Sequence, residues 1–215
     1  MIRRLIGAGL VAAAGAAAAS TVYVRYLREP CLTWGATPEE SAAELPGDEL
    51  APAPEIVTTR AIGVDAPPSD VWPWLVQMGP GRGGAYTYDW IENLAGLDMH
   101  SADEIHPEWQ HLELGDVMAL GDKGPRMEVA RIEPEQALVY ATTDRAWVWA
   151  FVLRQDGAGG TRLISRNRIT WPPASPLGRA ANVLMEPGSL VMERRMLLGI
   201  KERAERLAHP SEPPL

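Results

Sequence analysis

The chemistry-bearing side chains that lie closest together form a histidine-rich stretch in the middle of the chain. It contains His100, Asp103, Glu104, His106, Glu108 and His111. Imidazole and carboxylate groups are common ligands of divalent metals. Their spacing here fits neither the HExxH helix nor the set of two histidines and one carboxylate that holds non-haem iron. Solvated loop residues explain the stretch more simply, so we predict no metal site.

Residues for nucleophilic or acid–base catalysis form no recognisable motif. No serine lies in a G-x-S-x-G turn, and Cys31 is the only cysteine, which excludes a disulfide within the chain and a zinc cluster. Tyr88, Asp89 and Glu92 could donate or accept protons. Asp89 and Glu92 are also spaced as a capping box at a helix start, which explains both more simply. The sequence therefore leaves open whether the protein is an enzyme, identifies no catalytic residue and predicts no cofactor.

A glycine-rich loop, Gly79 to Gly84, precedes Tyr86. The loop lacks the GK[ST] ending of a phosphate-binding loop and the GxGxxG pattern of a dinucleotide site. We expect a flexible gate at the mouth of a pocket, where Arg82 binds a ligand carboxylate or phosphate and Tyr86 contacts the same ligand. A solvated arginine on a tight turn is the alternative.

Alternation along two β-rich runs predicts the lining of that pocket. Successive side chains of a strand point to opposite faces, and three arginines share one face of Thr161–Trp171, so its other face should point inward. The predicted lining consists of Trp147, Trp149, Phe151, Leu163, Ser165, Asn167, Ile169, Met192 and Met196. Apolar walls with a few polar side chains describe a small-molecule site. The alternative is a filled core without a cavity.

The order of secondary structure predicts a scaffold for these side chains. A strand at Ile56–Val64 precedes two short helices, near residues 69–78 and 89–95. Pro73 should kink the first of them or confine it to its first turn. Five β-rich runs between residues 116 and 171 predict an antiparallel meander, and a helical region follows from Leu177, interrupted at Pro187 and Gly188. This order predicts an α+β, helix-grip fold, in which an antiparallel sheet of about six strands wraps a long C-terminal helix.

Composition and charge limit the classes of function. The chain has 215 residues, of which 46% are hydrophobic and 22% charged, as is usual for a globular protein. Its formal net charge is −8 and its basic residues form no cluster, so an acidic surface should repel phosphate backbones. We therefore predict no binding to nucleic acid. The oligomeric state is not predicted.

The N-terminal part of the chain divides into two regions before the domain at 56–208. Residues 5–24 form an uncharged run about long enough to span a bilayer, with arginines on both sides, so residues 1–29 are predicted to be a single-pass membrane segment. A cleaved signal peptide, which would leave a secreted or periplasmic protein, is the alternative. Residues 30–55 are rich in proline and acids and read as a linker, and residues 209–215 form a tail.

Several segments of the chain resemble a known superfamily. APPSDVW at 66–72, after a strand, resembles the start of SRPBCC proteins, the superfamily of START-like and polyketide cyclase/dehydrase-like domains. The stretch 71–96, WGAT at 34–37, LPGDEL at 45–50 and the segment 186–205 resemble a bacterial, often membrane-tethered subgroup. The likeness covers roughly residues 34–208. It implies a helix-grip fold with an internal cavity, and it leaves the activity open because the superfamily includes carriers, receptors and cyclases.

These observations predict a START-like domain that binds an apolar small molecule, lipid or polyketide-like, in an internal cavity, with a membrane partner through residues 5–24. Two alternatives stay open. One is a cofactor-independent cyclase or hydrolase that acts on such a ligand with Arg82, Tyr86 or Glu92. The other is a structural domain that binds a partner, with its cavity filled by aromatic side chains.

Overall fold

Six antiparallel strands form one sheet in the order β1-β6-β5-β4-β3-β2. A computed structural model of the chain describes residues 21–121, 124–170 and 176–209. The strands are β1 (Ile56–Val64), β2 (Val117–Ala119), β3 (Arg126–Glu133), β4 (Ala137–Thr142), β5 (Trp147–Gln155) and β6 (Thr161–Ile169). From β2 to β6, each strand pairs with the strand that follows it in the sequence, and β1 pairs with β6 at the edge of the sheet.

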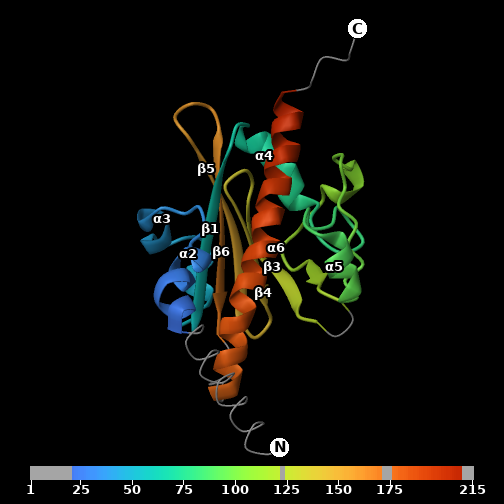
Figure 1. The fold of residues 1–215 in the computed structure, drawn as a ribbon. Coiled ribbons are helices and arrows are strands. Elements are labelled where there is room, and N and C mark those ends of the chain that lie inside the picture. Colours follow the sequence, from blue (N-terminus) through green and yellow to red (C-terminus); the bar gives the residue numbers. More distant parts are fainter. Residues whose placement is uncertain (1–20, 122–123, 171–175, 210–215) are drawn as a thin grey trace, which may run out of the picture.

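The long helix α6 (Pro176–Ala208) lies across one face of this sheet, which we call the inner face (Figure 1). Its side chains Met196, Leu197, Ile200 and Ala204 are buried in the main core, at helical spacing. The helix α4 (Pro68–Val76) packs against α6, while α5 (Asp89–Leu94) and the turn η3 (Pro107–Trp109) belong to the segment between β1 and β2. The predicted helix-grip fold is therefore confirmed.

The opposite, outer face of the sheet is covered by the segment that the sequence predicts as a linker. It contains α3 (Pro38–Ala42) and the turn η2 (Asp48–Leu50), and Leu45 and Ala51 are buried against outer-face residues of the sheet. The arginines on β6 bind this segment. Arg166 donates to Asp48 over 2.7 Å and Arg162 to Glu40 over 2.7 Å. These side chains point away from α6, as the alternation predicts, but they contact the chain and not only solvent.

The segment before it lies at the β1 edge and contacts α6. It consists of the π-helical turn η1 (Tyr23–Leu27) and α2 (Arg28–Leu32). Arg28 Nη2 and Glu186 Oε1 of α6 form an ion pair at 2.8 Å, and Tyr23 donates to the same carboxylate over 3.0 Å. The predicted run 5–24 falls mostly outside the described residues. Within residues 21–121, 124–170 and 176–209, no helix combines the length and the apolar character needed to cross a bilayer.

Three local predictions about helices are wrong. The helix α6 continues through Pro187, although a proline removes a hydrogen bond, because contacts such as the Arg28–Glu186 pair hold this turn in place. The helix α4 begins at Pro68 and continues past Pro73, so the alternative that Pro73 confines this helix to its first turn is wrong. Asp89 and Glu92 form no capping box. Asp89 instead accepts from the backbone and hydroxyl of Ser101, over 2.8 and 2.6 Å.

Candidate functional site

Two groups of polar side chains lie on the side of the sheet that faces α6, and the first centres on an ion pair. Arg60 on β1 is fully buried and donates from Nη1 to Glu193 Oε2 on α6. The same nitrogen donates to Ser189 Oγ over 2.9 Å, and Nε and Nη2 donate to the carbonyl of Cys31 over 3.2 Å. One guanidinium thus joins β1, α6 and α2.

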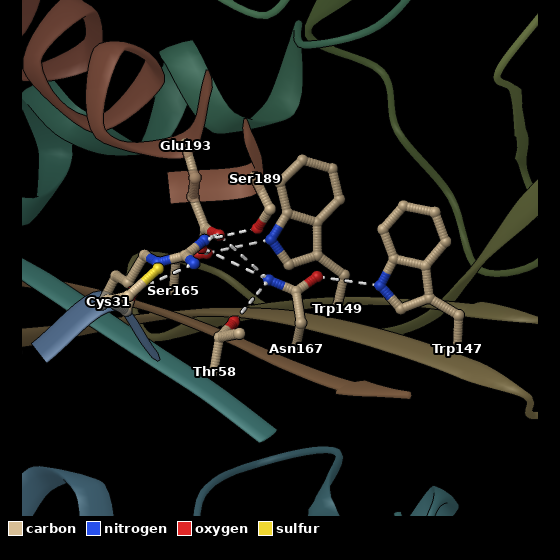
Figure 2. Close-up of polar contacts among 9 residues, drawn as sticks. Cys31, Thr58, Trp147, Trp149, Ser165, Asn167, Ser189 and Glu193 are labelled. Carbon is tan, nitrogen blue, oxygen red and sulfur yellow. Dashed lines mark hydrogen bonds and ion pairs between the residues drawn. The ribbon is translucent and has the colours of Figure 1, made fainter. Parts of the chain in front are cut away.

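The other side of Glu193 is bound by β6 and, through it, by two tryptophans of β5. Ser165 Oγ donates to Glu193 Oε1 over 2.6 Å, and Asn167 Nδ2 lies 3.3 Å from the same oxygen. Trp149 Nε1 donates to Ser165 Oγ over 2.9 Å and Trp147 Nε1 to Asn167 Oδ1 over 2.8 Å. Figure 2 shows the two indoles side by side, with their N–H groups directed at this chain of acceptors. We call this set of residues the Glu193 network.

The charges of the Glu193 network compensate one another. Burial raises the pKa of the Glu193 carboxyl, whereas the charge of Arg60 and the hydrogen bonds from Ser165 and Asn167 act in the opposite direction because they favour the ionised form. Both carboxylate oxygens accept hydrogen bonds within the protein. A buried carboxylate with such partners is held in place, so the network is suited to fastening α6 to the sheet.

The second group lines a cavity of about 340 Å³ at the other end of the sheet. Its walls come from the loop after α4, from the segment that leads into β2, from β2 itself and from the inner face of β3 and β4. The lining residues are Met78, Gly79, Pro80, Arg82, Leu112, Asp116, Val117, Met118, Ala119, Val129 and Tyr140. Most of these side chains are apolar, and this volume lies at the small end of the range for small-molecule sites.

Three side chains, those of Tyr140, Arg82 and Asp116, give this cavity its polar character, and the first two are hydrogen-bond donors. Tyr140 on β4 is buried, and its hydroxyl has no hydrogen-bond partner among the described residues. Burial raises the pKa of Tyr140 well above its ordinary value, so the phenol stays protonated and can donate. Arg82 reaches the cavity from the glycine-rich loop, and its Nη2 donates to the carbonyl of Trp109. The cavity therefore offers a neutral donor and a cation.

Of the eleven residues that the sequence predicts to contact the ligand, Leu163 is buried in the core and Ile169 pairs with Ile56 at the end of β6. The structure separates the other nine. Arg82 lines the cavity. Four others, Trp147, Trp149, Ser165 and Asn167, belong to the Glu193 network.

The remaining four of the nine pack elsewhere. Phe151 is fully buried beside Trp149, with 4.8 Å between ring centroids. Met196 is buried in the core, and Met192 Sδ lies 3.8 Å from Thr87 Oγ1. Tyr86 is buried, donates to the carbonyl of Trp74 over 2.9 Å and lies beneath the guanidinium of Arg203. Tyr86, just after the glycine-rich loop, therefore packs against α6.

Sequence reasoning missed Arg60, Glu193 and Tyr140. A signal existed for the ion pair, since Arg60 shares a strand face with Ile62 and Val64, and Glu193 shares a helix face with Met196 and Ile200. No signal existed for Tyr140, because nothing in an alternating strand tells whether a tyrosine hydroxyl meets an acceptor.

Glu92, a candidate acid in the sequence, is buried in α5, and its Oε2 has no partner among the described residues. Burial, and after it the charge of Asp89, raises the pKa of Glu92 to about 7. Such a value suits a general acid or base. Glu92 is not among the residues that line the cavity, so the geometry gives it no substrate to act on.

The histidine-rich stretch is spread over a loop. His100 lies 3.3 Å from Asp98, and His106 lies 3.4 Å from Glu108 and stacks on Trp109. Among the described residues, no three histidine, cysteine or acidic side chains gather as a metal would need.

No protein-family model matches this sequence, and no curated protein matches it. Solved structures with a similar arrangement do exist. The polyketide-cyclase-like protein Cgl2372 from Corynebacterium glutamicum is 14% identical, with a TM-score of 0.40 over 70% of this chain and 92% of its own. The protein MLL2253 from Mesorhizobium loti is 20% identical, with a TM-score of 0.40 over 70% and 98%. The KanY protein is 12% identical, with a TM-score of 0.47 over 71% and 99%.

Proposed function

We propose that this domain binds a compact apolar molecule in the cavity beside Tyr140. The observation that carries the proposal is a cavity of about 340 Å³, lined mainly by apolar residues and by Tyr140, whose buried hydroxyl has no hydrogen-bond partner among the described residues. Proteins rarely leave a buried polar group without a partner, because the loss of its hydrogen bond to water costs about 1–3 kcal/mol. A bound molecule would remove that cost and would cover the apolar walls.

The size of the cavity narrows the class of molecule. Ligand sites range from roughly 300 to 1,000 Å³, and this one lies near the lower limit. A fused ring system or a short acyl chain fits such a volume, in keeping with the polyketide-like class that the sequence resemblance implies. The methionines Met78 and Met118 in the wall can adapt to either shape.

The test is binding of a ring compound to the full chain, before and after the cavity is filled. Ala119→Phe adds an aromatic ring to the wall, and Ala95→Phe adds the same ring at an exposed position after α5. We expect 2-acetylnaphthalene, followed by its own fluorescence in equilibrium dialysis, to bind the wild type and Ala95→Phe. Ala119→Phe should lose at least tenfold in affinity, which corresponds to about 1.4 kcal/mol. Equal binding by all three proteins would contradict the site.

The membrane tether is a separate part of the proposal and rests on the uncharged run 5–24. If it anchors the domain, the full chain should stay in the membrane fraction after carbonate extraction. A soluble product whose first residue maps to Ser20 or Thr21 would instead show that the run is a cleaved signal peptide.

A further inference from the structure

The hydroxyl of Tyr140 differs from the other buried hydroxyls on the inner face in what it contacts. Tyr86 donates to the carbonyl of Trp74, and Ser165 donates to Glu193. Tyr140 is just as buried, lines the cavity and has no partner among the described residues. A protonated phenol in an apolar wall is a donor, so its natural complement is an acceptor atom on whatever fills the cavity.

Arg82 supplies a second donor to the same space. Its guanidinium has five N–H groups, and one of its nitrogens, Nη2, is bound to the carbonyl of Trp109, which fixes the side chain beside the cavity. The charge of Arg82 also acts on the Tyr140 phenol, as expected for two groups in one cavity. Two donors on residues that line the same cavity favour a ligand oxygen, which has two lone pairs to accept hydrogen bonds.

Asp116 also lines the cavity, and its negative charge affects the net charge that a bound ligand meets there. Its side chain is exposed, and Oδ2 accepts from the backbone of Glu113 over 2.9 Å. The negative charge of Asp116 offsets part of the positive charge of Arg82. A full negative charge on the ligand is therefore not required, and a neutral carbonyl oxygen suffices.

We propose that the ligand of this cavity carries an acceptor oxygen, as a carbonyl or a carboxylate, that is bound by the Tyr140 hydroxyl and the Arg82 guanidinium. The apolar remainder of the molecule packs against Met78, Met118 and Val129. This inference rests on the proposed function and narrows its ligand class from apolar molecules in general to ketones, acids and related oxygenated rings or chains.

The test compares three probes of the same ring and nearly the same shape. They are 2-acetylnaphthalene, 2-naphthoate and 2-isopropenylnaphthalene, which has a CH₂ group in place of the carbonyl oxygen. On the wild-type full chain, we expect the ketone to bind about tenfold more tightly than the alkene, because only the ketone accepts the Tyr140 proton. In Tyr140→Phe this ratio should fall to about one, with the affinity for the alkene changed less than about twofold.

Matched variants identify the source of the preference. Tyr86→Phe removes a buried hydroxyl that already has a partner, so it should leave the ratio of ketone to alkene near ten. Arg82→Met should weaken 2-naphthoate more than the ketone, because only the carboxylate carries a charge. Arg195→Met removes a partly exposed arginine that pairs with Glu202 on α6. It should change neither the affinity for 2-naphthoate nor the affinity for the ketone.

The outcomes separate this inference from the proposed function. If the ketone-to-alkene ratio is the same in the wild type and Tyr140→Phe, the acceptor inference is wrong. If the alkene still binds the wild type and loses affinity in Ala119→Phe, the cavity is nevertheless a binding site. If none of the three probes binds the wild type, both proposals fail. Tyr140→Phe is expected to fold normally, since it removes a group without a partner, and thermal unfolding checks this.

Discussion

The Glu193 network and the Tyr140 cavity lie on the same inner face of the sheet and differ in how their polar groups are satisfied. In the network, both oxygens of Glu193 accept hydrogen bonds, and Trp147 and Trp149 donate into the same chain of contacts. In the cavity, the hydroxyl of Tyr140 meets no acceptor among the described residues. The sequence points to the aromatic and polar residues of the network as the binding site, but the open space lies beside Tyr140.

Polar character alone therefore does not identify a binding site. A buried group whose partners are supplied by the fold stabilises the fold, and a ligand would have to break those contacts to bind there. A buried group without a partner leaves a favourable interaction to be made by a ligand. The comparison predicts large losses of stability in the first region and small ones in the second.

The largest effect is expected for Glu193→Gln. The substitution removes the charge that compensates the fully buried Arg60, and breaking one side of a buried ion pair costs about 3–5 kcal/mol. Urea denaturation of the variant and the wild type measures the difference in free energy of unfolding.

A matched control for this prediction is Glu202→Gln, which breaks the exposed pair with Arg195 and should cost less than about 1 kcal/mol. The double variant Arg60→Met with Glu193→Met should recover much of the loss, because no buried charge then remains unpaired. A Glu193→Gln protein as stable as the wild type would show that the ion pair does not hold α6.

An intermediate effect is expected for Glu92→Gln, and it depends on pH. The folded-state pKa of Glu92 is raised to about 7 from an ordinary 4.5, so the folded protein holds this proton more tightly than the unfolded chain does. The stability that the proton contributes is present below about pH 4.5 and is lost as the pH rises through 7. We expect Glu92→Gln to be more stable than the wild type at pH 8, by about 1–2 kcal/mol, and equal to it near pH 4.5.

Denaturation at both pH values measures this difference. Glu108→Gln serves as the control, because Glu108 is an exposed carboxylate in η3, between α5 and β2. This variant should show no pH-dependent gain in stability. A Glu92→Gln variant that is less stable than the wild type at pH 8 would mean that the carboxylate has a partner in solution.

The smallest effect on stability is expected for Tyr140→Phe. Removing a buried hydroxyl without a partner should leave the free energy of unfolding within about 0.5 kcal/mol of the wild type, or raise it. Tyr86→Phe, whose hydroxyl donates to Trp74, should lose about 1 kcal/mol or more in the same measurement. If Tyr140→Phe is the more damaging of the two, the comparison between the two regions is wrong.

Sequence patterns predict the strands well because turn residues separate them and alternation assigns their faces. The inward positions Ser165 and Asn167 do face α6, and the β6 arginines do point away from it. Helix ends are predicted less well. Pro187 lies within α6, and Asp89 binds Ser101, because contacts with distant parts of the chain outweigh the local rules.

The cavity beside Tyr140 could not be predicted, since it depends on which side chains fill the space between the loop at Gly79 and the inner face of the sheet. Trp147 and Trp149 find acceptors on the neighbouring strand and pack against the core. The space left over lies where the loop at Gly79, the short strand β2 and the inner face of β4 meet. These segments are far apart in the chain, and no local sequence pattern predicts the open space between them.

We expect a ligand to bind beside Tyr140 and not beside Trp147 and Trp149. Methionine methyl groups can distinguish the two sites, since Met78 and Met118 line the cavity, whereas Met192 of α6, which lies beside Thr87, belongs to the pocket that the sequence predicts with Trp147 and Trp149. NMR of the full chain with labelled methionine methyls, titrated with 2-acetylnaphthalene, tests the claim most directly. We expect large, saturable ring-current shifts for Met78 and Met118 and little change at Met192. Shifts at Met192 with none at Met78 and Met118 would contradict it and would place the ligand on the face that the sequence first indicated.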